Sequence, residues 1–100
     1  MSKSNLWIDL ETAGTTGSEK GIIILDEEYS GACRITLERC KKYYAITCGV
    51  YGGMVHTAFC AAENANKVYD QMKSELQEFI DKETTDEEET AFYEYFIRKY

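Results

Sequence analysis

The stretch that decides the fold runs from Tyr43 to Cys60 and reads YYAITCGVYGGMVHTAFC. Two runs rich in β-branched and aromatic residues flank Gly52-Gly53, and adjacent glycines can both adopt the positive φ that a tight hairpin turn requires. A slip of one residue would move one strand's whole apolar set to the other side of the sheet. Turn and pattern together favour a two-residue turn with three apolar pairs on one face: Val50 with Val55, Cys48 with Thr57, and Ile46 with Phe59.

Two more hairpins precede this one. Gly31 fits the left-handed position of a short loop that pairs Leu25 with Ile35, and a four-residue turn over 39–42 pairs Glu38 with Tyr43. These pairings place the apolar positions of neighbouring strands on one face, and they set Cys33 opposite Cys48. The period-2 alternation predicts strands over residues 5–11, 21–29, 32–38, 43–51 and 54–60.

The period changes after Cys60. Apolar residues then recur at steps of three and four, which predicts a helix over 62–82 that packs across the apolar face of the sheet. Thr85 followed by Glu88 forms a capping box, so a second helix is expected over 86–99. The predicted fold is a single α+β domain over residues 1–100, with a five-stranded antiparallel β-meander followed by two C-terminal α-helices.

Composition narrows the class of protein. No apolar run approaches the ~18 residues of a membrane span, and the N-terminal MSKSNLWIDLE has no apolar core of the kind found in signal peptides. We therefore expect a cytoplasmic protein without a membrane partner. In that compartment the four cysteines should be reduced thiols.

Catalytic and metal-binding motifs are missing from the sequence. The cysteines form no CxxC, the glycine-rich segment 14–21 lacks the spacing of a phosphate-binding loop, and the acidic runs lack that of a calcium loop. His56 and Cys60 are four residues apart on one strand, about 13 Å, which is too far for a direct pair. We expect no metal, no cofactor and no catalytic residue, and an enzyme is the less favoured reading.

The net charge and its distribution along the chain distinguish between the possible classes of binding partner. The net charge is −7, of which residues 61–100 carry −6. Nucleic-acid binding is disfavoured, because it depends on Lys and Arg neutralising phosphates. The acidic helices instead suggest one alternative function, the neutralisation of a basic protein partner by an immunity protein or a nucleic-acid mimic.

The second face of the sheet supplies the leading hypothesis. Its expected residues are too apolar for a solvated face, so either the C-terminal helix or a second copy of the chain should cover it, and we favour a homodimer. The function predicted is a cytoplasmic protein-interaction or regulatory module. A small-molecule or catalytic site around His56 is a further alternative. The candidate interaction surface comprises Tyr51, Met54, His56, Tyr93, Ile97 and Tyr100.

Overall fold

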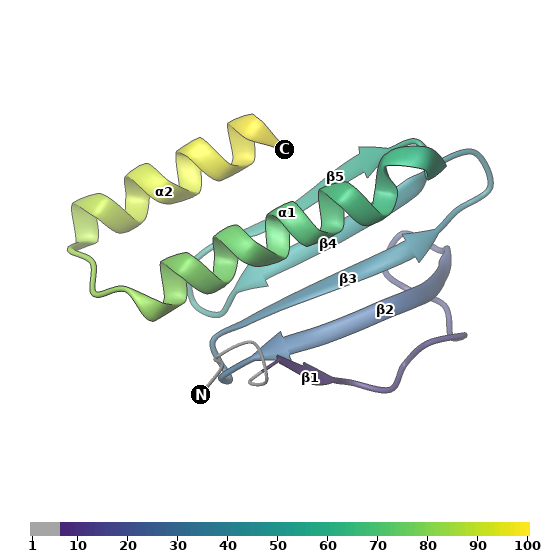
Figure 1. The fold of residues 1–100 in the computed structure, drawn as a ribbon, viewed down its shortest axis with the longest axis horizontal. Coiled ribbons are helices and arrows are strands. Elements are labelled where there is room, and N and C mark those ends of the chain that lie inside the picture. The colour runs from purple at the N-terminus through teal and green to yellow at the C-terminus, as the bar shows by residue number, and fades with distance from the viewer. Residues whose placement is uncertain (1–6) are drawn as a thin grey trace.

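The computed structural model describes residues 7–100 and confirms the predicted α+β architecture, with one antiparallel sheet in sequence order followed by two helices (Figure 1). The part of the first predicted strand at Asn5 and Leu6 lies outside the described residues. The elements are β1 Trp7–Asp9, β2 Ile22–Tyr29, β3 Cys33–Arg39, β4 Tyr44–Val50, β5 Val55–Cys60, α1 Ala62–Asp81 and α2 Asp86–Lys99.

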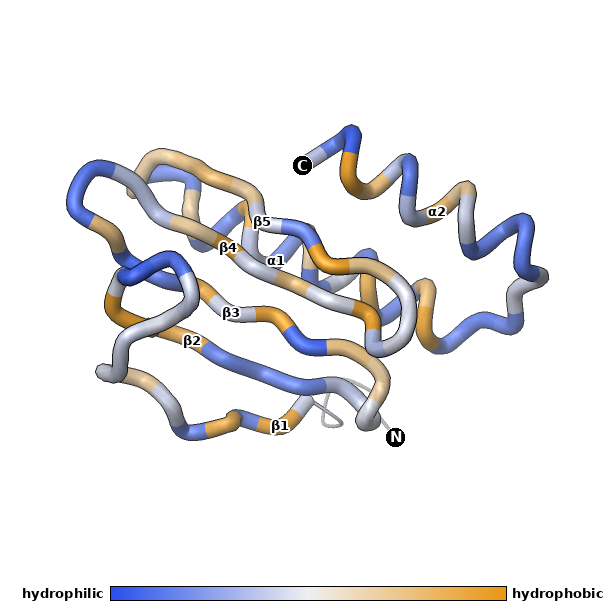
Figure 2. Tube along the Cα trace, turned by 180° about the vertical axis from the view of Figure 1, so that it is seen from behind, coloured by the Kyte–Doolittle hydropathy of each residue, from blue (hydrophilic) through white to orange (hydrophobic). Residues whose placement is uncertain are grey.

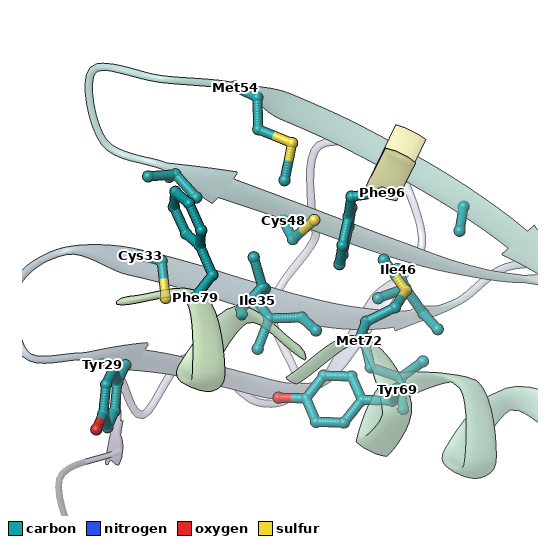
Figure 3. Packing of buried hydrophobic residues seen from close by; sticks show 14 of the residues in the cluster. Tyr29, Cys33, Ile35, Ile46, Cys48, Met54, Tyr69, Met72, Phe79 and Phe96 are labelled. Carbon is teal, nitrogen blue, oxygen red and sulfur yellow. The ribbon is translucent and has the colours of Figure 1, made fainter. Parts of the chain in front are cut away.

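Helix α1 covers one face of the sheet, which we call the inner face. It lies across β3, β4 and β5, as the sequence predicts. Its buried residues follow one another at steps of four and three, so they form a single stripe directed at the strands (Figure 3). The inward-facing apolar residues of β3 and β4 pack against this stripe. The stripe consists of Ala65, Tyr69, Met72, Leu76 and Phe79.

Helix α2 lies beside α1 on the same side of the sheet (Figure 1). Thr85 and Glu88 form the expected capping box at its start. Its buried residue, Phe96, points towards the inner face near Met54 (Figure 3), and Phe92 stacks on Phe79 of α1 with ring centroids 4.2 Å apart. The outer face of the sheet is therefore covered by neither helix.

The first two predicted registers are shifted by two residues over most of their length, which preserves the faces there. Leu25 pairs with Leu37 instead of Ile35, and Arg39 instead of Glu38 lies next to the β3–β4 turn, opposite Tyr44. Each connection lies one residue later in the chain than expected. Since side chains alternate with a period of two, the side chains from Leu25 onward keep their predicted faces. Ile23 is the exception, because a β-bulge between Ile23 and Leu25 pairs it with Glu38 and turns it towards the outer face. Cys33 now faces Val50, and the predicted Cys33–Cys48 pair is wrong.

The predicted β4–β5 register is wrong by one residue, which exchanges the faces of β5. Gly49 pairs with Val55 and Ala45 with Phe59, so Val55 and Phe59 point outward. The turn holds three residues, because the amide of Val50 donates to the carbonyl oxygen of Met54 at 2.9 Å. Only Gly52 has a positive φ, +77°, as a type II turn requires.

Hydrophobicity favours the wrong register, since the more apolar set of β5, which contains Val55 and Phe59, faces outward and the set that contains His56 faces inward. The core accepts Met54 and Ala58, which are 7% and 4% exposed. Val55 and Phe59, by contrast, are 77% and 58% exposed. Small Ala58 lies opposite buried Ile46 on the face that both helices contact, where a phenylalanine would overfill the space.

The connection between β1 and β2 folds back over the outer face at β2 and β3. The buried carboxylate of Glu38 accepts hydrogen bonds from the amides of Glu19 and Gly21, both at 3.1 Å. Gly17 lies so close to Glu38 that an added Cβ would come within 2.3 Å of its carboxyl carbon. This loop therefore covers half of the outer face and leaves β4 and β5 open.

Candidate functional site

The three predicted surface residues of the β4–β5 hairpin do not lie together. Tyr51 is half exposed at the turn, where its hydroxyl donates to Glu28 Oε2 at 2.6 Å. Met54 belongs to the core. His56 lies on the inner face with its ring edge-on to Phe96, at a centroid distance of 6.4 Å. The one-residue register change is the reason that Met54 and His56 face the helices.

The three predicted residues of α2 are also divided. Tyr93 packs on Phe79, and its hydroxyl lies where a side chain on Gly53 would be. The hydroxyl of Tyr100 donates to Glu75 of α1. Only Ile97 presents a mainly free side chain, 44% exposed. The aromatic residues that the sequence left without a role thus mostly attach α2 to the core.

His56 lies among the residues of the inner face. Its Nε2 atom is buried and has no hydrogen-bond partner among the described residues. A groove on the opposite face of the sheet is not lined by His56. An unpaired ring nitrogen beside an aromatic residue is a cost to folding and offers no activated nucleophile.

The cysteines are free thiols. Burial raises the pKa of Cys33 to about 11, with a smaller effect of the Glu28 charge, and burial raises that of Cys48 to about 12. Burial also raises the pKa of Cys40 and Cys60. Because the thiolate is the reactive form, these positions do not favour nucleophilic chemistry.

Residues 7–100 contain neither a metal-binding cluster nor a membrane-spanning helix. Within this part of the chain, no three His, Cys, Asp or Glu side chains gather closely enough to hold a metal ion. Neither of its helices is long and apolar enough to cross a membrane.

The open half of the outer face carries exposed apolar side chains. We call Tyr43, Val55 and Phe59 the outer patch; they are 42%, 77% and 58% exposed. Tyr43 and Phe59 contact each other edge to face, with centroids 5.4 Å apart. In Figure 2, which shows the sheet from the side opposite the helices, β4 and β5 are mostly pale to orange whereas the middle of β2 is blue. Sequence reasoning missed this patch because it turned Val55 and Phe59 inward.

A groove of about 720 Å³ adjoins the outer patch. It extends over β3 and β4 between the β1–β2 loop and the hairpin turn, and Val55 forms part of its wall. Small side chains create it, since the outward positions of β4 here are Thr47 and Gly49. Its lining also includes Thr12, Thr15, Thr16, Ser18, Arg34, Thr36 and Tyr51.

Asp26 joins the loop to the floor of this groove. Arg34 donates to its carboxylate through Nε at 2.9 Å and Nη2 at 2.6 Å, and Thr12 and Thr36 donate through their hydroxyls. Burial acts to raise the pKa of Asp26, but the hydrogen bonds from Arg34, Thr12 and Thr36 and the charge of Arg34 outweigh it. The pKa therefore lies below its usual value.

Comparison with protein families, with curated proteins and with solved structures found no match for this chain.

Proposed function

We propose that this chain is a cytoplasmic protein-interaction or regulatory module that binds its partner through the outer patch. The observation that carries the proposal is the exposure of Val55 and Phe59 on a sheet face that neither helix covers. Single exposed apolar residues are ordinary, but an exposed aromatic pair and an exposed valine on one sheet face beside a groove are typical of a binding surface. Aromatic side chains are also the residues most enriched at protein interfaces.

The distribution of charge supports the same surface. Residues 61–100 form the helical side and carry −6 of the net charge of −7, whereas strand β5 has no charged residue. A partner can therefore approach the outer patch without meeting the acidic side chains of the helices. The four free thiols are consistent with the reducing environment of the cytoplasm.

Site-specific photo-crosslinking in the host cell tests this proposal. A photoreactive residue replaces Phe59 in one variant and Ile97, a comparably exposed position on α2, in the control. We expect discrete crosslinked products from position 59 and few from position 97. The proposal is wrong if position 59 gives no discrete product, or if both positions give the same ones.

One observation favours a second candidate function, the neutralisation of a basic protein. Both acidic helices lie on one side of the sheet, so their charges are gathered on one side of the molecule. Such binding would produce crosslinks from position 97, and when the crosslinking is repeated in a cell lysate they would disappear at about 1 M salt, where the screening length falls to about 3 Å. Crosslinks from position 59 that persist at this salt concentration would favour the outer patch.

A further inference from the structure

The outer face of hairpin β4–β5 carries a projection at one end. Tyr43 and Phe59 stand edge to face there, and both are about half exposed. Lys42 precedes Tyr43 in the chain and borders the same shallow depression beside the aromatic pair. This end of the hairpin is therefore an aromatic knob with a cation beside it.

The other end of the same hairpin carries a hollow. Gly49 pairs with Val55 and presents no side chain to the outer face, so the groove deepens over β4 at this position. The carboxylate of Glu28 lies at this end, where it accepts the hydrogen bond from Tyr51. Arg34 lines the hollow opposite Gly49, but its charge is paired with that of Asp26, so Glu28 supplies the remaining negative charge beside the hollow.

Knob and hollow are related along the strands. Phe59 pairs with Ala45 and Val55 with Gly49, so the two features lie four residues, about 13 Å, apart on one face. We infer that the partner bound by the outer patch is a second copy of this chain, packed outer face to outer face about a two-fold axis between knob and hollow. The Tyr43–Phe59 knob of each copy then fills the Gly49 hollow of the other. This inference rests on the proposed function and names its partner.

Charge complementarity supports this arrangement. The two-fold axis that places each knob in a hollow also brings Lys42 of one copy towards Glu28 of the other. The dimer therefore contains two such Lys42–Glu28 pairs. The acidic helical layers lie on the far sides of the two sheets, so their like charges are kept apart. A two-fold interface requires a self-complementary surface, which these features provide.

Sedimentation velocity with charge-reversed variants tests the inference. The wild type should dimerise at about 100 µM, and Lys42→Glu and Glu28→Lys should each dimerise at least about fivefold more weakly, because each replaces two attractions with repulsions. An equimolar mixture of the two variants should recover the wild-type affinity, since the heterodimer restores both pairs in reversed polarity. A monomeric wild type at this concentration, or a mixture no tighter than the separate variants, overturns the inference.

A second pair of variants tests the knob. Phe59→Ser should weaken dimerisation at least about tenfold, whereas Ile97→Ser, on the helical side, should leave it unchanged. Both side chains are exposed, so circular dichroism should show the same fold for both variants. Equal effects on dimerisation would overturn the inference. If the wild type is monomeric but position 59 still crosslinks a different protein, the inference fails while the proposed function stands.

Discussion

Replacing Asp26 with Asn should destabilise the protein more than any other loss of one charge on β2. The carboxylate is only 2% exposed and accepts four hydrogen bonds, two from the guanidinium of Arg34 and one each from Thr12 and Thr36. The Asn side chain keeps one acceptor oxygen but presents an NH₂ group to donors on its other side. Asp26→Asn thus leaves donors unpaired and removes the counter-charge of Arg34.

The expected loss is about 2 kcal/mol. Removing one partner of a fully buried ion pair costs about 3–5 kcal/mol, and a hydrogen bond to a charged group contributes about 1.5–3 kcal/mol. The Arg34 side chain is 45% exposed, so water can solvate it when the carboxylate is lost, which reduces the penalty. For a domain of this size, a loss of about 2 kcal/mol lowers the melting temperature by about 8–16 °C.

Urea denaturation followed by fluorescence measures this change. Trp7 is the one tryptophan of the chain; its ring lies 5.0 Å from that of Tyr29, and its Nε1 donates to Gln77, so its emission should report unfolding. Glu28→Gln is the matched control, because it removes the same charge from the same strand where the hydrogen bond is exposed. This control should change the free energy of unfolding by less than about 1 kcal/mol.

The dependence on pH provides a second check. The pKa of Asp26 is lower in the folded protein than in the unfolded chain, so the folded state binds fewer protons between the two values. The stabilisation is therefore complete above the ordinary Asp pKa of about 3.9 and is lost as the pH falls through the folded value. The difference between the wild type and Asp26→Asn should shrink below about pH 4. A difference from the control of less than about 0.5 kcal/mol at neutral pH would refute the role of Asp26.

Three further changes follow from individual contacts. Gly53→Ala should lower the free energy of unfolding, measured by thermal unfolding, by about 1–3 kcal/mol, since its Cβ would lie 2.3 Å from the hydroxyl oxygen of Tyr93. Adding Tyr93→Ala should recover part of this loss, and strictly additive losses would contradict the clash. His56→Leu should raise the free energy of unfolding by about 1 kcal/mol, because it removes the unpaired Nε2, and a lower stability in urea would indicate that this nitrogen has a partner. Glu75→Gln should speed hydrogen exchange in α2, because Glu75 accepts bonds from Tyr95, Lys99 and Tyr100. Unchanged exchange would show that the aromatic contacts of α2 hold the helix without Glu75.

The order of the elements could be predicted from local patterns. Alternation over β3 and β4, the three- and four-residue steps of α1 and the Thr85 capping box each predict an element that the structure contains. These signals depend on neighbouring residues, so they need no knowledge of distant contacts. Shifts of two residues in the first two hairpins left the inward-facing sets unchanged from Leu25 onward, because the side-chain period is two, whereas the bulge that turns Ile23 outward had no signal in the local pattern.

The candidate site depended on information that the sequence does not contain locally. The pattern of strand β5 favours the register with Val55 and Phe59 inward, but the choice depends on which side chains fit against α1 and α2. The sequence by itself determined a meander with two helices. Tertiary packing decided that Met54 and Ala58 enter the core while Val55 and Phe59 face solvent, because the space between sheet and helices accepts only one of the two sets.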